Sequence, residues 1–392
     1  MNALRPHPLP FLPAQGSLAV VAIPVRNEAE RIGACLEALA AQREAGPFTV
    51  LLLLNGCTDG TEAAVSARAG ALPFRLVLRR ARLPAAHAHA GEARARAMEA
   101  AAALLERAGQ PEGLLLTTDA DSRVAPDWLA ATRAEMDAGA EAVAGWVEHD
   151  PMEAALLPAA LARRIARENA YEALLAELEA RLDPLAADPW PRHRMASGAS
   201  LAVRLPAFRR VGGLPRVPVG EDRAFCAALA AADIRLRHSR TVRVLTTCRT
   251  EGRATGGAAD TLRRWLAEPG LACDPMLEPV ALASRRWRAR AALRRRHAAR
   301  DALGLLREAA RLRLPWREPD AWMNLPFGSL WQAAESASPL LGRCRLHPLQ
   351  LPSQILRARA LLAGVLRRGA ADPAGIVRRV PAAPPGALAP WP

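Results

Sequence analysis

The chain has 392 residues, 51% of them hydrophobic and 4% aromatic, which suits two domains or one large domain with an appendage. Its formal net charge is +14, and every basic residue is an arginine. Because no basic patch is interleaved with aromatic residues, we expect no nucleic-acid partner. The charge still allows peripheral contact with an anionic membrane, although no apolar run approaches the ~18 residues of a membrane span.

The cysteines and the first residues indicate the compartment. The six cysteines form no C-x-x-C pair, which argues against a zinc ribbon or a disulfide framework and predicts reduced thiols. Residues 1–16 are rich in proline and contain no apolar core of a signal peptide, so we interpret them as a short leader. The expected location is the cytoplasm, at the inner membrane surface where membrane contact occurs.

Strand-like and helix-like segments alternate through the first half of the chain. Apolar runs rich in leucine and valine predict strands at 18–25, 48–54, 74–78, 114–118 and 142–147. Helical spacing of apolar residues predicts helices at 30–42, 61–68 and 91–107. This alternation is typical of an α/β fold with a mostly parallel sheet between helices.

The second half is mainly helical. We expect one long helix over 151–185, shorter helices at 206–211 and 223–232, and two short strands at 234–238 and 241–245. Further helices are predicted at 285–313, 327–341 and 353–366, followed by a tail rich in proline and alanine from residue 370.

Two carboxylates, Asp119 and Asp121, follow the predicted strand that ends at residue 118. In extended chain they project to the same side, where they repel each other unless a cation lies between them. Hard carboxylate oxygens suit Mg²⁺ or Mn²⁺. The alternative is a structural one, because aspartate is also common in turns and at helix N-caps.

Five segments, in order, resemble the family 2 glycosyltransferases, which have the GT-A fold. The resemblance spans residues 18–247. The segments are VAIPVRNEAERI (21–32), LLNGCTDGT (53–61), the helix that begins GEAR (91–94), TTDADS (117–122), and GASLAVRLPAFRRVGGLP with the following GED (198–222). Each segment is a weak signal alone, and their order makes the resemblance specific.

The resemblance implies an inverting, non-processive transfer of a sugar from a nucleotide-diphosphate sugar to an acceptor hydroxyl. Asp222 or Glu221 would be the general base, and a divalent cation on Asp121 would neutralise the leaving diphosphate. Asp119 would lie near the ribose or share the cation. The remaining residues expected to bind the nucleotide sugar are Pro24, Asn27, Glu28, Asn55, Asp59 and Arg94. The acceptor would be a saccharide, a lipid-linked sugar or a small molecule.

The sequence departs from the family pattern at two places. The acidic pair common in the second turn is replaced here by Leu54 and Asn55, and because an amide both donates and accepts, we expect the preferred base to differ from uracil. The Gln-X-X-Arg-Trp motif of processive members has Thr261 in place of glutamine, which disfavours a processive synthase. Arg264 of that segment would bind diphosphate or lie on a helix surface, and His238 would be a third metal ligand or a partly exposed polar residue.

The resemblance also divides the chain. It implies a GT-A domain over 17–250, with a nucleotide-sugar half (17–150) and an acceptor half (151–250), followed by a helical region (251–369) and the tail (370–392). Two other functions stay open at this point. One is a nucleotidyltransferase, disfavoured because no glycine-rich loop follows the first strand. The other is a non-enzymatic basic protein that binds an anionic partner through its C-terminal arginines.

Overall fold

The computed structural model describes residues 18–84, 89–250, 252 and 256–371. The strands are β1 (Ala19–Val25), β2 (Phe48–Asn55), β3 (Arg75–Ala81), β4 (Leu114–Thr117), β5 (Arg123–Val124), β6 (Ala142–His149), β7 (Leu201–Arg204) and β8 (Leu236–Thr246). The helices are α1 (Ile32–Ala40), α2 (Thr61–Ala69), α3 (Ala90–Arg107), α4 (Trp128–Asp137), α5 (Pro151–Ala154), α6 (Ala159–Leu182), α7 (Leu205–Arg210), α8 (Glu221–Ala231), α9 (Ala258–Ala267), α10 (Val280–Ala298), α11 (Ala302–Arg311), α12 (Pro319–Met323), α13 (Phe327–Ala337) and α14 (Leu351–Ala371).

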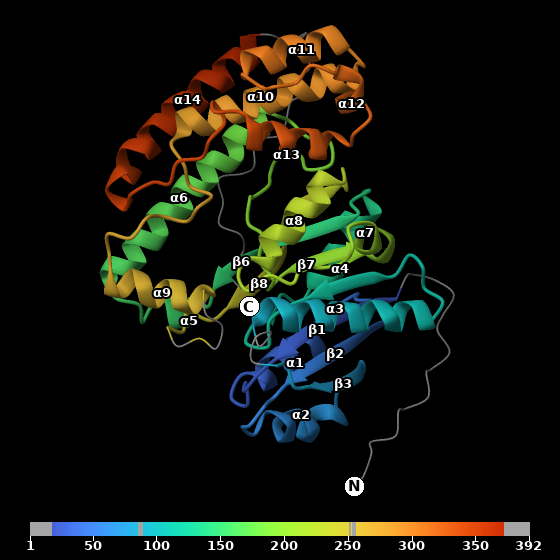
Figure 1. Ribbon diagram of the computed structural model, residues 1–392. Coiled ribbons are helices and arrows are strands. Elements are labelled where there is room, and N and C mark those ends of the chain that lie inside the picture. Colours follow the sequence, from blue (N-terminus) through green and yellow to red (C-terminus); the bar gives the residue numbers. More distant parts are fainter. Residues whose placement is uncertain (1–17, 85–88, 251, 253–255, 372–392) are drawn as a thin grey trace.

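One sheet runs through the molecule in the order β3-β2-β1-β4-β7-β6-β8-β5. β1, β2, β3 and β4 are parallel, β7 is antiparallel to both β4 and β6, and β8 is parallel to β6. The expected α/β fold with a mixed, mostly parallel sheet is confirmed, and so is the expected helical C-terminal part (Figure 1).

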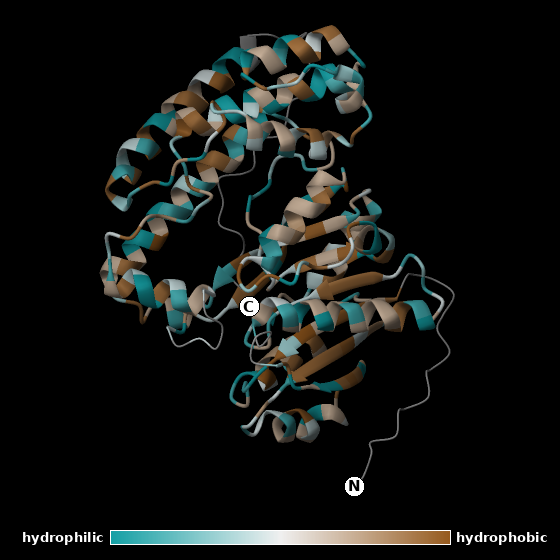
Figure 2. Cartoon of the chain, viewed as in Figure 1, coloured by the Kyte–Doolittle hydropathy of each residue, from teal (hydrophilic) through white to brown (hydrophobic). Residues whose placement is uncertain are grey.

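Helices cover both faces of the sheet, as the strand sequences require. Successive residues of β1 enter opposite cores: Val21 and Ile23 pack with α1, α2 and α4, whereas Val20 and Ala22 pack with α3, α7 and α8. A strand buried on both faces is a continuous apolar run rather than an alternating one. Figure 2 shows these central strands in brown between helices of mixed hydropathy.

The C-terminal helices form two cores of their own. In one, Tyr171 and Leu175 of α6 pack with Trp287 of α10 and Ala358 of α14. The other joins α10 to α11, α12 and α13 through apolar residues such as Leu293, and these helices lie apart from the sheet (Figure 1). We expected α6 to belong to the acceptor half, yet it packs with helices made much later in the chain. The domain boundaries therefore stay a prediction.

Several predicted elements differ in extent. The long helix expected over 151–185 is interrupted before Pro158, which is the N-cap of α6 and has no N–H to donate. The helix expected over 285–313 is two helices, because Arg300 adopts a left-handed conformation with φ of 54°. The two short strands at 234–245 are one strand, β8, with a register shift opposite Gly145 and Trp146.

The prediction missed two strands, β5 and β7, and three helices, α4, α9 and α12. The leader at 1–16 lies outside the described residues. The tail predicted from residue 370 lies outside them too, except for the end of α14. All six cysteines lie in the described part of the chain and are free thiols. No helix among the described residues is long and apolar enough to cross a membrane.

Candidate functional site

The site forms where the parallel strands β1, β2 and β4 end at one edge of the sheet, the place where ligands bind in open α/β sheets. The loop after β1 is tied to the loop after β2. The Thr58 backbone N–H donates to Asn27 Oδ1 at 2.8 Å, and the Glu28 N–H donates to Thr61 Oγ1 at 2.8 Å. Asn27 has φ of 54°, a conformation that asparagine tolerates better than most residues. The two loops thus form one frame.

Asp59 and Asn55 also hold this frame. Asp59 accepts hydrogen bonds from the backbone N–H of Ala29 at 3.1 Å and of Thr61 at 3.0 Å, one on each carboxylate oxygen. Slight burial raises the pKa of Asp59, but the hydrogen bond from the Thr61 hydroxyl and those from the two backbone N–H groups outweigh it and lower the pKa. Asn55 is buried, and its Oδ1 accepts from the Leu83 N–H at 3.2 Å. Both residues position backbone, and a contact from either to the nucleotide stays a prediction.

Pro24 lies on a strand between two neighbours, where its missing N–H would normally cost a ladder hydrogen bond. β4 pairs with β1 only as far as Ala22, so Pro24 lies beyond the end of that pairing. β2 continues alongside, opposite Pro24 at Leu53. The sheet therefore opens on the β4 side of Pro24, and the chain after Thr117 turns away to carry Asp119 and Asp121.

Asp121 lies in a cluster of carboxylates. Its side chain is 10% exposed, and its Oδ2 is 2.7 Å from Nη2 of Arg249. Arg249 also donates to both oxygens of Glu28, at 2.8 and 3.1 Å. Burial and the neighbouring charge of Asp119 raise the pKa of Asp121, Arg249 opposes them, and the result is about 6. A carboxylate in this state gains from an additional cation.

Arg94 joins the β4 side of the site to the α8 side. It reaches from α3 and donates from Nη2 to Asp119 Oδ1 at 2.8 Å and from Nε to Glu221 Oε1 at 3.0 Å. Its Nη1 donates to Thr117 Oγ1 and to the Gly198 carbonyl. Burial lowers the pKa of Arg94, and the two carboxylates outweigh it and raise the pKa. Four of its N–H groups go to the protein, so Arg94 bridges the two sides of the site, and its contact with diphosphate stays a prediction.

Two glycines allow this close packing. A Cβ on Gly198 would lie 2.3 Å from Cζ of Arg94, and a Cβ on Gly91 would lie 2.1 Å from the Val217 carbonyl oxygen. Real Cβ atoms essentially never approach so closely. Glycine at 198 therefore lets the guanidinium lie against the chain before β7, and glycine at 91 lets α3 begin directly beside the segment that leads into α8.

The first turn of α8 presents the other predicted acids. Gly220, with φ of 75°, turns the chain into the helix so that Glu221 and Asp222 are its first residues. Glu221 is buried against Arg94. Asp222 is partly exposed, and its Oδ2 accepts from the Gly198 N–H at 3.1 Å while its Oδ1 accepts from the Arg223 N–H at 2.7 Å. A carboxylate has about four acceptor positions, so Asp222 keeps lone pairs for a proton and Glu221 anchors Arg94.

The charge of the site bears on whether a divalent cation fits. In the described part of the chain, the carboxylates of Glu28, Asp119, Asp121 and Glu221 form ion pairs with the guanidinium groups of Arg94 and Arg249, so the carboxylates outnumber the guanidinium groups in these pairs. The described residues hold no group of three or more His, Cys, Asp or Glu side chains placed to ligate a metal ion. The site therefore fits a cation held by one or two carboxylates, with the other ligands supplied by diphosphate and water.

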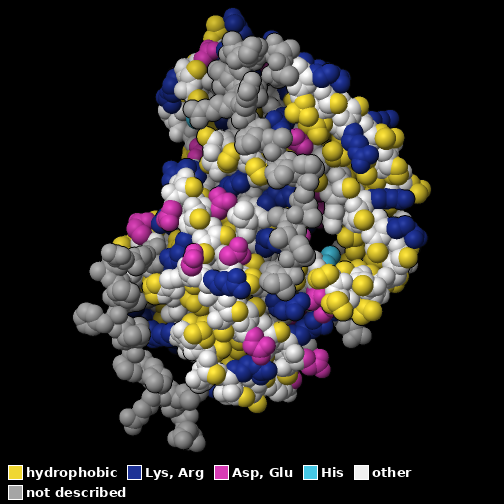
Figure 3. Space-filling view, turned by 180° about the vertical axis from the view of Figure 1, so that it is seen from behind, with side chains coloured by type: hydrophobic (Ala, Val, Ile, Leu, Met, Phe, Trp, Pro, Cys, Tyr) yellow, Lys and Arg dark blue, Asp and Glu magenta, His cyan; other side chains and the backbone are white. Residues whose placement is uncertain are grey.

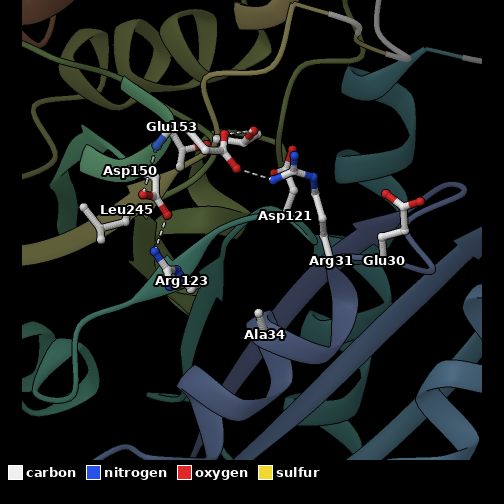
Figure 4. Close-up of a pocket in the computed structure, with 10 residues that line it drawn as sticks. Glu30, Arg31, Ala34, Asp121, Arg123, Asp150, Glu153 and Leu245 are labelled. Atoms are coloured by element: carbon white, nitrogen blue, oxygen red, sulfur yellow. Dashed lines mark hydrogen bonds and ion pairs between the residues drawn. The ribbon is translucent and has the colours of Figure 1, made fainter. Parts of the chain in front are cut away.

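A pocket of about 360 Å³ opens beside Asp121, between the start of α1 and the end of β8 (Figure 4). Its walls include two ion pairs, Arg31 with Glu153 at 2.6 Å and Arg123 with Asp150. Burial raises the pKa of Glu153, but Arg31, Thr247 and the Cys248 N–H outweigh it and lower the pKa to about 2. These contacts keep the end of β8 and the start of α5 next to Asp121.

Two predicted residues lie elsewhere. His238 is at the start of β8, where its Nδ1 is 2.8 Å from Asp188 Oδ2, whereas Thr246 at the far end of the strand contacts Ser122. The structure therefore contradicts His238 as a third metal ligand. Arg264 is exposed on α9, and Trp265 beside it is stacked by Arg164 with 4.2 Å from Cζ to the ring centroid. Of the two roles expected for Arg264, the structure agrees with the position on a helix surface.

Arg249 is the residue that sequence reasoning missed. It lies three positions after β8, in a chain with 53 basic residues, so its type alone carries no signal. Its partners, Glu28 and Asp121, are 221 and 128 positions away, beyond the reach of any local pattern.

Comparisons with known proteins agree with this description. Residues 20–179 match the sequence model of glycosyl transferase family 2. Solved structures similar to the chain include a mannosyltransferase from Pyrobaculum calidifontis in complex with GDP-Man and Mn²⁺ (19% identity, 90% of this chain and 79% of that one, TM-score 0.40). TarS 1–349 from S. aureus in complex with UDP-GlcNAc is also similar (15% identity, 90% and 92%, TM-score 0.44).

A third similar structure is the glucosyl-3-phosphoglycerate synthase of Mycobacterium tuberculosis with Mn²⁺, UDP and glucosyl-3-phosphoglycerate (16% identity, 66% and 84%, TM-score 0.36). No curated protein matches the sequence. The family match favours the glycosyltransferase reading over a nucleotidyltransferase or a non-enzymatic basic protein. Residues 20–179 therefore resemble glycosyl transferase family 2, and the expected enzyme class, a glycosyltransferase, is confirmed.

Proposed function

We propose that the protein transfers a sugar from a nucleotide-diphosphate sugar to an acceptor hydroxyl, once per encounter and with inversion at the anomeric carbon. One observation carries the proposal. Arg94 bridges Asp119 Oδ1 at 2.8 Å and Glu221 Oε1 at 3.0 Å, and thereby holds the start of α8 against the end of β4. The acids that follow β4 and the acid at residue 222 thus face one common site, which is the arrangement that donor activation and proton removal together require.

Asp222 is the general base of this proposal. Its carboxylate takes the proton of the acceptor hydroxyl as the oxygen attacks the anomeric carbon from the face opposite the leaving nucleoside diphosphate. The hydrogen bonds from Gly198 and Arg223 fix the carboxylate while leaving it partly exposed to an acceptor. A single displacement of this kind inverts the anomeric configuration, and it needs no covalent intermediate.

The donor is proposed to lie on the frame made by the loops after β1 and β2. Asn27, Glu28 and Asp59 shape its nucleotide side, and Asp119 and Asp121 face its diphosphate. A divalent cation, Mg²⁺ or Mn²⁺, held by Asp121 with Asp119 would neutralise the charge that develops on the leaving diphosphate. Asn55 in place of an acid supports a base other than uracil. The threonine at 261 supports single rather than repeated transfer.

The first prediction concerns the donor. Thermal unfolding is measured with UDP, GDP and dTDP and their sugars, with and without Mn²⁺. One nucleotide is expected to stabilise the protein only with Mn²⁺, by about 2.7 kcal/mol at 100 times its dissociation constant. Asp121→Ala is expected to abolish the shift, because the cation then loses its main protein ligand.

A matched control removes a carboxylate elsewhere. Asp137 lies exposed at the end of α4, and Asp137→Asn is expected to keep the full ligand shift. If no nucleotide stabilises the wild type under any condition, the proposed donor class is wrong. If a nucleotide stabilises Asp121→Ala as well as wild type, the role of Asp121 is wrong.

The acceptor side is proposed to face an anionic membrane, through α14. Residues 336–371 contain six arginines and no acidic residue. Leu356 and Leu366 of α14 are 66% and 42% exposed, and Leu349, in the short turn before the helix, is 84% exposed. Arg357 and Arg359, both exposed, follow Leu356 closely, and Figure 3 shows hydrophobic and basic side chains together along the outer edge of the helical part. Such a surface suits a monolayer of acidic lipids.

The second prediction tests this surface. Binding to vesicles that contain phosphatidylglycerol is measured by co-sedimentation. Each arginine near an anionic surface contributes about 1 kcal/mol, so Arg357→Ala/Arg359→Ala is expected to weaken binding about 30-fold. The matched control, Arg79→Ala/Arg82→Ala, removes two exposed arginines at the β3 edge, far from α14 (Figure 1), and is expected to bind as wild type. If both variants lose vesicle binding equally, net charge rather than this surface of α14 accounts for the membrane contact.

A further inference from the structure

Arg249 lies at the centre of the carboxylate cluster, although it belongs to a distant part of the chain. Its backbone N–H donates to Thr247 Oγ1 at 3.1 Å, which fixes the chain just after β8. Both Nη atoms of its side chain contact carboxylates of the site, Glu28 through two hydrogen bonds and Asp121 at 2.7 Å. The side chain is 21% exposed, so solvent and ligands reach it.

The contact with Asp121 places a fixed positive charge where the proposed cation would bind. A metal ion bound to Asp121 Oδ2 and a guanidinium 2.7 Å from the same oxygen would repel each other at short range. The two therefore exclude each other on this oxygen. The contacts with Glu28 are not in conflict with the metal ion, because they use a different carboxylate.

An ion pair with a purely structural purpose would be expected to satisfy the charges that it joins. Arg249 instead serves two carboxylates at once, because its Nη2 lies 2.7 Å from Asp121 Oδ2 and 2.8 Å from Glu28 Oε1. Arg249 is thus a partial counter-ion. It offers a planar donor group of the kind that pairs with phosphate oxygens in two parallel hydrogen bonds.

We propose that Arg249 is an exchangeable counter-ion of the donor site: it holds Asp121 before the donor binds, yields that oxygen to the divalent cation, and then donates to the diphosphate. Glu28 keeps its hold on Nη1 throughout and so limits how far the guanidinium moves. This inference rests on the proposed function, because it assumes a diphosphate donor. It adds a diphosphate-binding residue that lies outside the segments of the family resemblance.

The test has two arms, each with its own readout. In the first arm, Mn²⁺ binding without any nucleotide is measured by electron paramagnetic resonance. Arg249→Ala is expected to bind Mn²⁺ at least tenfold more tightly than wild type, because the competing charge is gone. In the second arm, with saturating Mn²⁺, the same variant is expected to bind UDP, GDP or dTDP at least tenfold more weakly, while affinity for the matching nucleosides is unchanged.

Control variants separate exchange from a structural role. Arg264→Ala removes an exposed arginine on α9 and is expected to match wild type in both arms. Arg249→Lys keeps one charge without the planar pair of donors, and it is expected to give intermediate values should Arg249→Ala fail to fold. Unchanged or weaker Mn²⁺ binding in both Arg249 variants would overturn the proposal, and so would unchanged diphosphate binding.

Failure of the proposed function gives a different pattern. If the wild type binds none of the three nucleotides, the donor class is wrong, and the second half of the proposal falls with it. The Mn²⁺ arm still decides whether Arg249 competes for Asp121, because it contains no nucleotide. The two failures are therefore distinguishable.

Discussion

Asp222→Asn is expected to lower kcat by roughly 10²–10⁴-fold, the usual contribution of a positioned general base. The amide has nearly the same shape as the carboxylate, and its carbonyl oxygen still accepts the hydrogen bond from the Gly198 N–H. It loses the hydrogen bond from the Arg223 N–H, because the amide nitrogen cannot accept, and it loses the ability to take a proton. Steady-state kinetics with the donor identified by the ligand panel, or release of the nucleoside diphosphate, measures the effect.

The affinity for the donor separates chemistry from folding in this variant. Asp222→Asn is expected to keep the stabilisation by nucleotide and Mn²⁺, because the proton is removed at the acceptor and not at the diphosphate. Activity within tenfold of wild type would assign the base to another group. A parallel loss of nucleotide binding would place Asp222 in the donor site instead.

Arg94→Met is expected to destabilise the fold by about 3–5 kcal/mol, the range for breaking a buried ion pair by removal of one partner. The side chains of Arg94 and Glu221 are 7% and 9% exposed, so Glu221 would be left buried without a counter-charge. Methionine fills most of the volume, which keeps the loss electrostatic. Equilibrium unfolding in urea measures the change in the free energy of unfolding.

Two further variants show whether the loss of the ion pair between Arg94 and Glu221 causes the loss of stability. Arg96→Met removes a neighbouring arginine of α3 whose pair with Glu92 is partly exposed, and a loss below about 1 kcal/mol is expected. Arg94→Met/Glu221→Gln removes the stranded charge, so it is expected to recover part of the stability. If the double variant is as unstable as the two single losses added together, the contact between Arg94 and Glu221 is not the origin of the effect.

Much of the fold was predictable because it depends on local patterns. The buried strands are runs of leucine and valine, and a run such as LLLT at 114–117 is hard to place anywhere but in a sheet core. The acids at 119 and 121 follow the end of a strand directly, and the acids at 221 and 222 begin a helix. Chain position alone therefore placed both pairs at the ends of elements, where sites form.

The bridges between these acids were not predictable. Arg94 and Glu221 are 127 positions apart, and Arg249 and Glu28 are 221 apart, so no periodicity connects them. The break at Arg300 was missed for a related reason: a left-handed residue is usually marked by glycine or asparagine, and an arginine carries no such mark. Long-range charge pairing and uncommon backbone conformations are set by tertiary structure.

The packing of α6 has a consequence for synthesis of the protein. Its apolar face, with Tyr171 and Leu175, is covered by α10 and α14. Roughly 170 residues separate the end of α6 from the start of α14, so at about 5–20 residues per second the ribosome needs about 10–35 s to produce its cover. The last strand of the sheet, β8, ends at residue 246, so for the later part of that time the nascent chain exposes the apolar face of α6 beside a finished sheet, a state prone to aggregation.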